Sequence, residues 1–214
     1  MKVSMPFFRV LVLILSSLLL TTGCSPVRLM PQASGQTVYI TPIDGASAQI
    51  VVTEAFQTAV VTQRPTYGQS WKARDLEIHV GKPMTEAVLS YVSAQVPDTR
   101  IGNRRDSRPA TVIITPSLGA IEFGVDDKKA VNNMALAGIL ASGSKATIGA
   151  VVHLNAIIQI EGQSPQRVSI RGTGEKVAAL ISMTEKDAAD TIGMAIDSAA
   201  KQLSNIVAVK LRED

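Results

Sequence analysis

Cys24 is the only cysteine in the chain and the residue with the most distinctive chemistry. A thiol can serve as a nucleophile, a metal ligand, a disulfide partner or an attachment point for another group. A disulfide within the chain is excluded, because no second cysteine exists. The position of Cys24, directly after the small residues Thr-Thr-Gly at 21–23, indicates an attachment point.

The residues before Cys24 have the pattern of an export leader. Lys2 and Arg9 are the only charged residues before the cysteine, and an uncharged apolar run follows at 10–20. A positive start, an apolar stretch and a small-residue exit are the three parts of a secretory signal peptide. The run is shorter than the ~20 apolar residues that a membrane-spanning helix needs. We therefore predict that residues 1–23 are a signal peptide, absent from the mature chain.

The sequence LTTGCS at 20–25 resembles the bacterial lipobox, in which a small residue precedes an obligatory cysteine. Gly23 and Cys24 match its two most restrictive positions, whereas Thr21 stands where leucine is preferred. The resemblance implies that Cys24 carries a diacylglycerol on its sulfur and an acyl chain, such as palmitate, on its amino group. Ser25 after the cysteine implies the outer membrane. Two or more acyl chains hold a protein stably at a membrane surface.

The composition argues against nucleic acid as a partner. The 21 basic residues of the full chain become 19 when Lys2 and Arg9 leave with the signal peptide, against 18 acidic residues. A nearly neutral chain lacks the positive field that nucleic-acid binding requires. The remaining length fits a single domain of ordinary size. Aromatic residues make up 4% of the chain, so we expect a core of aliphatic side chains.

The mature chain is expected to consist of a tether and one domain. Residues 24–36 combine Pro, Gly, Ser and Gln without periodicity, which is typical of a flexible lipidated tether. An α+β periplasmic domain is predicted at 37–214, with a first strand at 37–41. The pattern between 43 and 75 fits either a strand pair or a short helix, with a loop at 64–71.

A strand, a helix and a second strand are predicted in the middle of the chain. LEIHV at 76–80 alternates like a half-buried strand, and apolar residues three and four apart predict a helix over 83–95. In the strand predicted at 110–125, the apolar residues change from even to odd positions near Gly119. One extra residue turns the side chains over, so this change predicts a β-bulge.

The strongest pattern in the chain is an alternation at 145–161, where every even position is apolar. It predicts a long strand with one buried face. After the turn sequence GQSPQ, the segment 167–175 alternates again, with Val168 and Ile170 inward. The two segments therefore predict an antiparallel hairpin.

A C-terminal helix is predicted over 185–207 from its apolar stripe. Thr184 with Asp187, or alternatively Ser182 with Glu185, would form a capping box at its start. The order of elements predicts an α+β sandwich, with two helices on one face of an antiparallel sheet of about four strands.

This layout, over most of residues 37–207, resembles the YajG-type family of small Gram-negative lipoproteins. The local similarities are ARDL before the middle helix and the polar hairpin. The resemblance implies an envelope lipoprotein, of a general architecture that recurs in accessory subunits of transport and assembly machines. It implies no particular functional residues.

Four arginines form the most marked charged cluster, and they lie between the middle helix and the next strand. A guanidinium group is suited to phosphate and carboxylate. We consider two interpretations, a solvated loop and a contact with phospholipid head groups, lipid A phosphates or an acidic partner. The four residues are Arg100, Arg104, Arg105 and Arg108.

The uncharged segment at 134–144 is rich in Ala and Gly and is too short to span a membrane. Exposed apolar patches often mark partner or membrane contacts, and the alternative is a segment folded over its own core. The candidate contact residues are Leu136, Ile139 and Leu140.

Known enzyme motifs are absent from the sequence, which holds no HExxH, no GxSxG and no phosphate-binding glycine loop. His79 and His153 occupy outward positions of predicted strands without a carboxylate at ligand spacing, so no metal and no cofactor beyond the lipid is expected. Glu122 and Glu161 are the candidates for the paired carboxylates of a cell-wall hydrolase, and nothing marks them out.

The sequence thus predicts a non-enzymatic, lipid-anchored domain that binds another envelope protein. It is expected to be an accessory subunit of a transport or assembly complex. The main alternative is a lipid or glycolipid carrier, with a groove between sheet and helices and the arginine loop for phosphate. A pocket in the structure would favour the carrier, and a continuous core with a flat apolar patch would favour the binding module.

Overall fold

The computed structural model describes residues 26–35, 41–68, 71, 75–102, 109–137 and 144–213. The predicted signal peptide, Cys24 and all but Thr41 of the predicted first strand lie outside the described residues. The strands are β1 (Val27–Leu29), β2 (Ser47–Val51), β3 (Val60–Gln63), β4 (Leu76–His79), β5 (Asp98–Gly102), β6 (Val112–Asp126), β7 (Lys145–Ile160) and β8 (Gln166–Ala179). The helices are α2 (Glu54–Gln57), α3 (Gly81–Gln95), α4 (Lys128–Ala137) and α5 (Glu185–Arg212), with a 3₁₀ turn at Leu180–Ser182.

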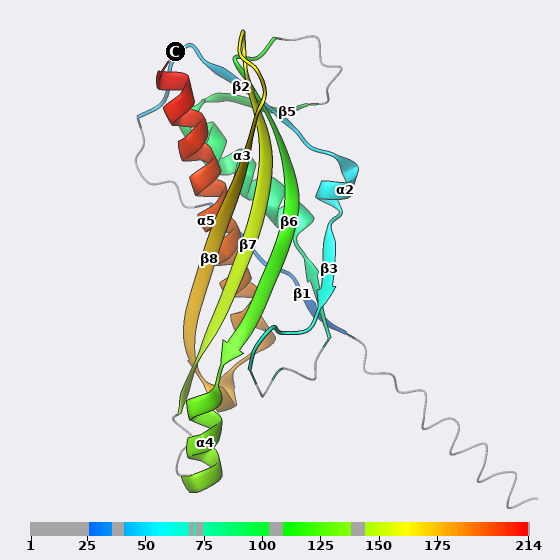
Figure 1. Ribbon diagram of the computed structural model, residues 1–214, viewed down its shortest axis with the longest axis vertical. Coiled ribbons are helices and arrows are strands. Elements are labelled where there is room, and N and C mark those ends of the chain that lie inside the picture. The colour runs from blue at the N-terminus through cyan, green and yellow to red at the C-terminus, as the bar shows by residue number, and fades with distance from the viewer. Residues whose placement is uncertain are drawn as a thin grey trace, which may run out of the picture.

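The protein is an α+β sandwich built on an elongated sheet. Five strands in the order β5-β2-β6-β7-β8 form this sheet, and a smaller sheet has the order β1-β4-β3. The two long helices, α3 and α5, pack against each other on one side of the large sheet (Figure 1). The α+β class and the two helices on one face were therefore predicted correctly.

Strands β6, β7 and β8 form a long antiparallel ribbon, which confirms the predicted hairpin and bulge. The even residues of β7 from Ala146 to Ile160 are buried, and their odd neighbours are partly or fully exposed. The register between β6 and β7 shifts between Leu118 and Ala120, at the predicted bulge. The ribbon thus has an inner face against the helices and an open outer face.

Helix α5 lies along the inner side of β7 and β8. The predicted capping box is present at its start: the Asp187 backbone N–H donates to the Thr184 hydroxyl, and the Thr184 N–H donates to the Asp187 carboxylate at 2.9 Å. The helix backbone comes close to β8 because two inward positions are glycines. A Cβ at Gly172 or Gly174 would overlap the α5 backbone.

Apolar side chains fill the space between the large sheet and the helices. Buried residues from both helices, both sheets and the α2 region form one continuous cluster. Its fully buried members from the ribbon and α5 include Phe123, Ile148, Leu154, Ile158, Ile192 and Ile196. The expected aliphatic core is present, with Phe123 and Trp71 in ring contact at 6.0 Å between centroids.

The prediction of a single antiparallel sheet of about four strands was wrong in two respects. Strand β2 pairs in parallel with both β5 and β6, so the large sheet is mixed, and a second sheet exists. Every residue of β2 after Ser47 is buried, so the strand shows no alternation from which to recognise it. The ambiguous region at 43–75 holds both alternatives, because β2, α2 and β3 follow one another there.

The described part of the predicted tether, residues 26–35, is packed into the fold. Strand β1 pairs in parallel with β4, and Leu29 is 1% exposed. Further along, the Ser34 backbone N–H and hydroxyl donate to the Asp197 carboxylate of α5 at 2.7 and 2.8 Å. A three-residue strand between prolines has no local signal, and its pairing with distant residues fixes it.

Among the described helices, none is long and apolar enough to span a membrane.

Candidate functional site

The structure describes few of the contact residues predicted from the sequence. Cys24, Arg104, Arg105, Arg108, Ile139 and Leu140 lie outside the described residues. Leu136 belongs to α4. Arg100 was predicted in a loop but lies in β5, where pairing with β2 extends the sheet. Its guanidinium donates to the Pro109 carbonyl at 3.2 Å, across the two ends of the segment 103–108.

The two predicted contact surfaces are far apart. Strand β5, with Arg100, and helix α4, with Leu136, lie at opposite ends of the long axis (Figure 1). They are two separate candidate sites.

Each histidine has a glutamate beside it, so the prediction of histidines without a nearby carboxylate was wrong. His79 Nε2 lies 2.7 Å from Glu77 Oε1, and His153 Nε2 lies 3.2 Å from Glu122 Oε1. Both pairs join outward side chains of strands, where residues two apart or on neighbouring strands meet. In the part of the chain that the structure describes, no three His, Cys, Asp or Glu side chains come together as a metal site would require.

The two carboxylates considered for a hydrolase do not meet. Glu122 pairs with Val151 in β7, whereas Glu161 follows the other end of that strand. Ten residues of strand separate these positions, about 33 Å at the usual rise per residue. Glycosidases need their two carboxyl groups within about 10 Å.

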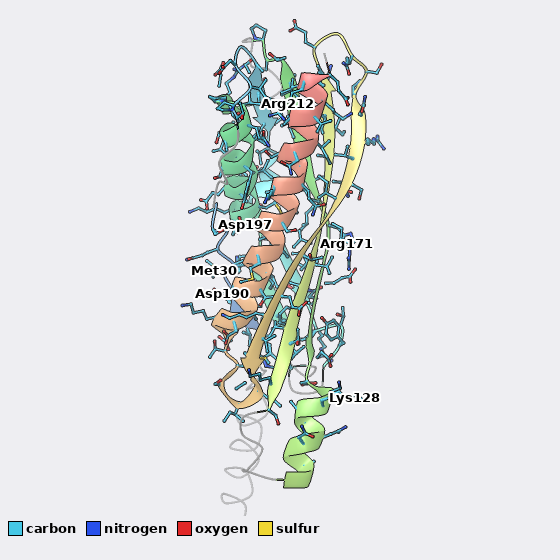
Figure 2. The ribbon with its side chains drawn as sticks, turned by 90° about the vertical axis from the view of Figure 1, so that its left-hand side faces the viewer. Met30, Lys128, Arg171, Asp190, Asp197 and Arg212 are labelled. Atoms are coloured by element: carbon cyan, nitrogen blue, oxygen red, sulfur yellow. The ribbon has the colours of Figure 1, made fainter. Side chains whose placement is uncertain are left out.

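The outer face is the largest open surface of the ribbon. It consists of the side chains of β6, β7 and β8 that point away from α3 and α5; Figure 2 shows Arg171 on this side. Its residues form rows across the three strands, and we name each row by its β7 residue. Row 149 holds Gly124, Gly149 and Glu175, row 151 holds Glu122, Val151 and Thr173, row 153 holds Ala120, His153 and Arg171, and row 155 holds Ser117, Asn155 and Ser169.

Tyr67 covers the two glycines of row 149. The Thr66 N–H donates to the Phe123 carbonyl at 2.7 Å, and the Val125 N–H donates to the Tyr67 carbonyl at 3.2 Å, so this segment pairs with the edge of β6. The Tyr67 side chain then lies over Gly124 and Gly149, where a Cβ would overlap it. It is still 47% exposed.

Carboxylates surround this tyrosine. Burial raises the pKa of the Tyr67 hydroxyl, and the charges of Asp126, Glu175 and Glu122 raise it further. This end of the outer face is therefore acidic, although Lys145 lies on it in the last row. An aromatic ring within carboxylates is suited to a guanidinium or ammonium group.

The other end of the outer face is basic and hollowed. Arg167 and Arg171 are exposed outward side chains of β8 and lie in rows 157 and 153. Between them, a shallow groove of about 380 Å³ follows row 155. Polar and aliphatic side chains line it, including Ser117, Asn155, Ile157, Arg167 and Ser169.

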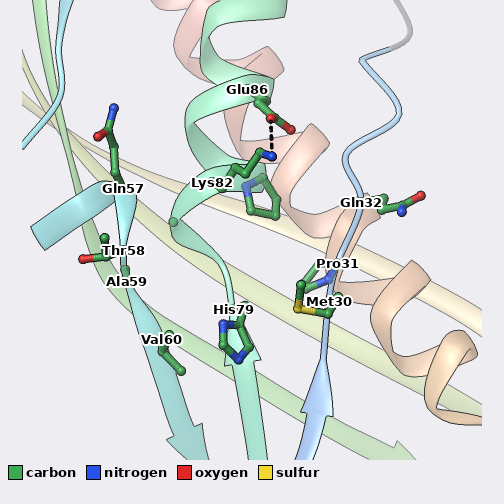
Figure 3. A pocket seen from close by; sticks show the side chains of 12 residues that line it. Met30, Pro31, Gln32, Gln57, Thr58, Ala59, Val60, His79, Lys82 and Glu86 are labelled. Carbon is green, nitrogen blue, oxygen red and sulfur yellow. Dashed lines mark ion pairs between the residues drawn. The ribbon is translucent and has the colours of Figure 1, made fainter. Parts of the chain in front are cut away.

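A second groove of about 380 Å³ lies at the ends of β1 and β4 (Figure 3). Met30 and Val60, which are 65% and 45% exposed, form its apolar part. Lys82 and Glu86 of α3 form an ion pair at 3.8 Å on its other side. This groove lies at the end of the small sheet, next to the start of α3.

Lys176 is a charged residue on the inner face of β8, and α5 supplies its partners. Its Nζ lies 2.7 Å from Asp187 Oδ1 and 3.0 Å from Asp190 Oδ2. The hydrogen bond from Lys176, with those from Thr184, lowers the pKa of Asp187 to about 2. The hydrogen bond to Asp187 likewise raises the pKa of Lys176.

Acidification is expected to destabilise the domain through Asp187. Its pKa is about 2 in the folded protein and 3.8 for an unperturbed carboxyl group. The stabilisation is therefore complete above about pH 4 and is lost as the pH falls through about 2. We expect about 1 kcal/mol, because Lys176 is 31% exposed and solvent screens the pair. Urea unfolding of the wild type and of Asp187→Asn at about pH 5 and about pH 2.5 measures this contribution. If both proteins lose the same free energy of unfolding on acidification, the loss does not come from Asp187.

Comparisons with known proteins give distant similarities. No family model and no curated protein matches the chain. Protein XCC0632 from Xanthomonas campestris, of family DUF330, is 12% identical over 88% of this chain and 98% of its own, with a TM-score of 0.46. A minor lipoprotein from Acinetobacter baumannii is 7% identical over 79% and 96%, with a TM-score of 0.41. Rare lipoprotein B from Shewanella oneidensis is 7% identical over 78% and 94%, with a TM-score of 0.35. At these values, the similarities assign neither a family nor a function.

Proposed function

We propose that this protein is a lipid-anchored, non-catalytic binding protein of the bacterial envelope, held at the periplasmic face of the outer membrane. It acts as an accessory subunit of a transport or assembly complex, as the YajG-type layout suggests. It needs no cofactor, and its only bound group is the lipid attached to Cys24. Its partners are the membrane and another envelope protein.

The position of β1 carries this proposal. The chain enters the fold at Val27, whose N–H donates to the Asp75 carbonyl at 2.8 Å. Each residue spans at most about 3.6 Å, so Cys24 is within about 11 Å of Val27. Strand β1 is an edge strand, and Pro26 before it is exposed, so the chain leaves the domain at its surface. A lipid on Cys24 would therefore hold the folded domain directly at the membrane without unfolding it.

The packed core favours a binding module over a lipid carrier. A carrier of the kind considered above needs a groove between the large sheet and the helices. In the described residues, this interface is filled by side chains that are almost fully buried. The two grooves described above are shallow and lie outside it. The open surfaces are therefore the sites on which function is expected to depend.

Metabolic labelling and crosslinking together test the proposal. Wild-type protein should incorporate labelled palmitate and sediment with outer membranes, and Cys24→Ser should do neither. Crosslinking in intact envelopes should then capture a specific partner with the wild type. Replacing Arg100, Arg104, Arg105 and Arg108 with Gln should weaken this capture in a salt-dependent way, because salt screens exposed charges within ~8–10 Å.

Ser replacements of Leu136, Ile139 and Leu140 provide the comparison, since loss of apolar contacts does not depend on salt in this way. An unlabelled wild type would overturn the lipid anchor. A labelled wild type that turned over a glycan or peptide, and lost this activity on a single carboxylate substitution, would overturn the non-catalytic assignment.

A further inference from the structure

We propose that the outer face of β6, β7 and β8 binds a second copy of the same chain, in an antiparallel arrangement about a twofold axis. The axis lies between the two sheets, perpendicular to the strands, and passes between rows 151 and 153. This inference goes beyond the proposed function, and the pairing itself does not require the lipid.

The distribution of charge on the outer face selects the antiparallel arrangement. Glu122, Glu175 and Asp126 lie in rows 151, 149 and 147, and Arg171 and Arg167 lie in rows 153 and 157. Lys145 lies beyond the acidic rows and Glu161 beyond the basic ones. A twofold axis along the strands would place each acidic end on the partner's acidic end, and like charges at close range cost several kcal/mol. An axis perpendicular to the strands keeps β6 over β6 and β8 over β8 but reverses the rows. Glu175 of β8 then lies among the partner's arginine rows, while Glu122 and Asp126 lie over its uncharged β6 residues.

The rows match in shape as well as in charge. The outward residues of β7 extend from Lys145 to Gln159, so the centre of the face falls between Val151 and His153. Reversal about this centre places row 149 of one copy over row 155 of the other. The partly exposed Tyr67 then faces the partner's polar groove. Glu175 faces Ser169 in the copy opposite and lies between the two arginines there.

Twofold symmetry makes each of these contacts occur twice. In such an interface the same patch serves both copies, so a patch must be complementary to itself. The outer face meets this condition with an aromatic and acidic half and a hollow and basic half. Near the centre, Glu122 of row 151 and Arg171 of row 153 flank the axis, and His153 pairs with Glu122 at 3.2 Å.

The area of the face is sufficient for a stable dimer. Strands β6, β7 and β8 have 15, 16 and 14 residues. At about 3.4 Å per residue and about 4.8 Å between strands, the shared face is about 45 Å by about 14 Å. Both copies together would bury about 1,300 Å², within the range of specific interfaces. Two such sheets pack aligned, about 10 Å apart and within about 30°.

The proposed symmetry also allows both copies to be anchored in the same membrane. A twofold axis perpendicular to the strands keeps the β6 side of both copies on the same side of the dimer. The small sheet with β1 lies beyond β6, on the side away from β8 (Figure 1). Both β1 strands therefore lie on the same side of the dimer, as two lipids in one leaflet require.

Thiol crosslinking of the full chain in its own membrane tests this arrangement. Val151→Cys places a thiol next to the axis, and a short bifunctional maleimide should join two copies. The same substitution at Lys201, an exposed position of α5 away from the outer face, should give no dimer. The unsubstituted chain, with Cys24 as its only cysteine, serves as the background.

Charge reversals make the test specific. Arg167→Glu with Arg171→Glu should reduce the Val151→Cys dimer about tenfold or more, and so should Glu122→Arg with Glu175→Arg. Co-expression of these two chains should restore a mixed dimer, because each then meets the opposite charge. Tyr67→Ala should also weaken the dimer, and Lys201→Glu should not.

Three results would overturn the proposal. One is a Val151→Cys chain that gives no dimer above background although it is folded and membrane-bound. The second is a dimer that persists unchanged in both charge-reversed chains, which would place the interface elsewhere. The third is crosslinking of the Val151 thiol to a different protein in place of a second copy.

Discussion

Replacing Ile158 with aspartate is expected to unfold the domain. Ile158 is 2% exposed on the inner face of β7 and pairs with Ile114 of β6. A carboxylate there would lose its hydration without gaining a partner, which costs several kcal/mol. This is a large part of the 5–15 kcal/mol that stabilises a typical domain. Urea unfolding followed by far-UV circular dichroism measures the loss.

Gln159→Asp is the matched control for this experiment. Gln159 is the next residue in β7, but it is exposed on the outer face. Its substitution should change the free energy of unfolding by no more than about 0.5 kcal/mol. Two variants with equal losses would show that the register of β7 is not the one described.

Replacing Gly172 with valine is expected to displace α5 from the sheet. A Cβ at this position would overlap the Ala195 carbonyl and lie 2.7 Å from the Ala199 Cβ. Backbone atoms cannot rotate away as a side chain can, so the helix must move. Overpacking of this kind typically lowers the free energy of unfolding by 1–3 kcal/mol. We expect a loss of about 3 kcal/mol or more, because valine adds a Cβ atom that carries two methyl groups.

Hydrogen exchange distinguishes displacement of α5 from a general loss of stability. In Gly172→Val, the α5 amides should exchange faster, while the amides of β6 and β7 stay protected. Thr173→Val is the control, since Thr173 is the next residue in β8 and points to the open outer face. If Gly172→Val is as stable as this control, then α5 does not contact β8 in the way described.

The elements that could be predicted are those whose burial or capping produces a pattern within their own residues. Every even residue of β7 faces the helices, so burial imposed a strict alternation from Ala146 to Ile160. The capping box of α5 likewise lies within four residues, Thr184 to Asp187. In both cases the contacts that fix the element are local or repeat regularly.

The elements that were missed depend on partners far away in the sequence. Strand β1 has three residues and exists because it pairs with residues 76–78. Strand β2 is buried on both faces between β5 and β6, so it shows no polar alternation. Arg100 was predicted in a loop because the arginine-rich sequence around it has no strand pattern. Its pairing with the distant Gln49 cannot be recognised from the sequence.

The outer-face site was missed for a related reason. Tyr67 was expected in a loop, and only the fold brings it over Gly124 and Gly149. A sequence signal exists in these two glycines, since glycine in a strand often marks the close approach of another group. The partner of the two glycines could not be identified without the register of β6 against β7.

The position of β1 also sets how far from the bilayer this protein can act. If Cys24 carries a lipid, the chain between the lipid and Val27 is at most about 11 Å long. The longest strand, of 16 residues, extends about 53 Å at the usual rise. The surfaces of the ribbon then stay within roughly 65 Å of the membrane. A partner that diffuses in the periplasm would meet it only in this layer, whereas a second anchored copy would search for it in two dimensions.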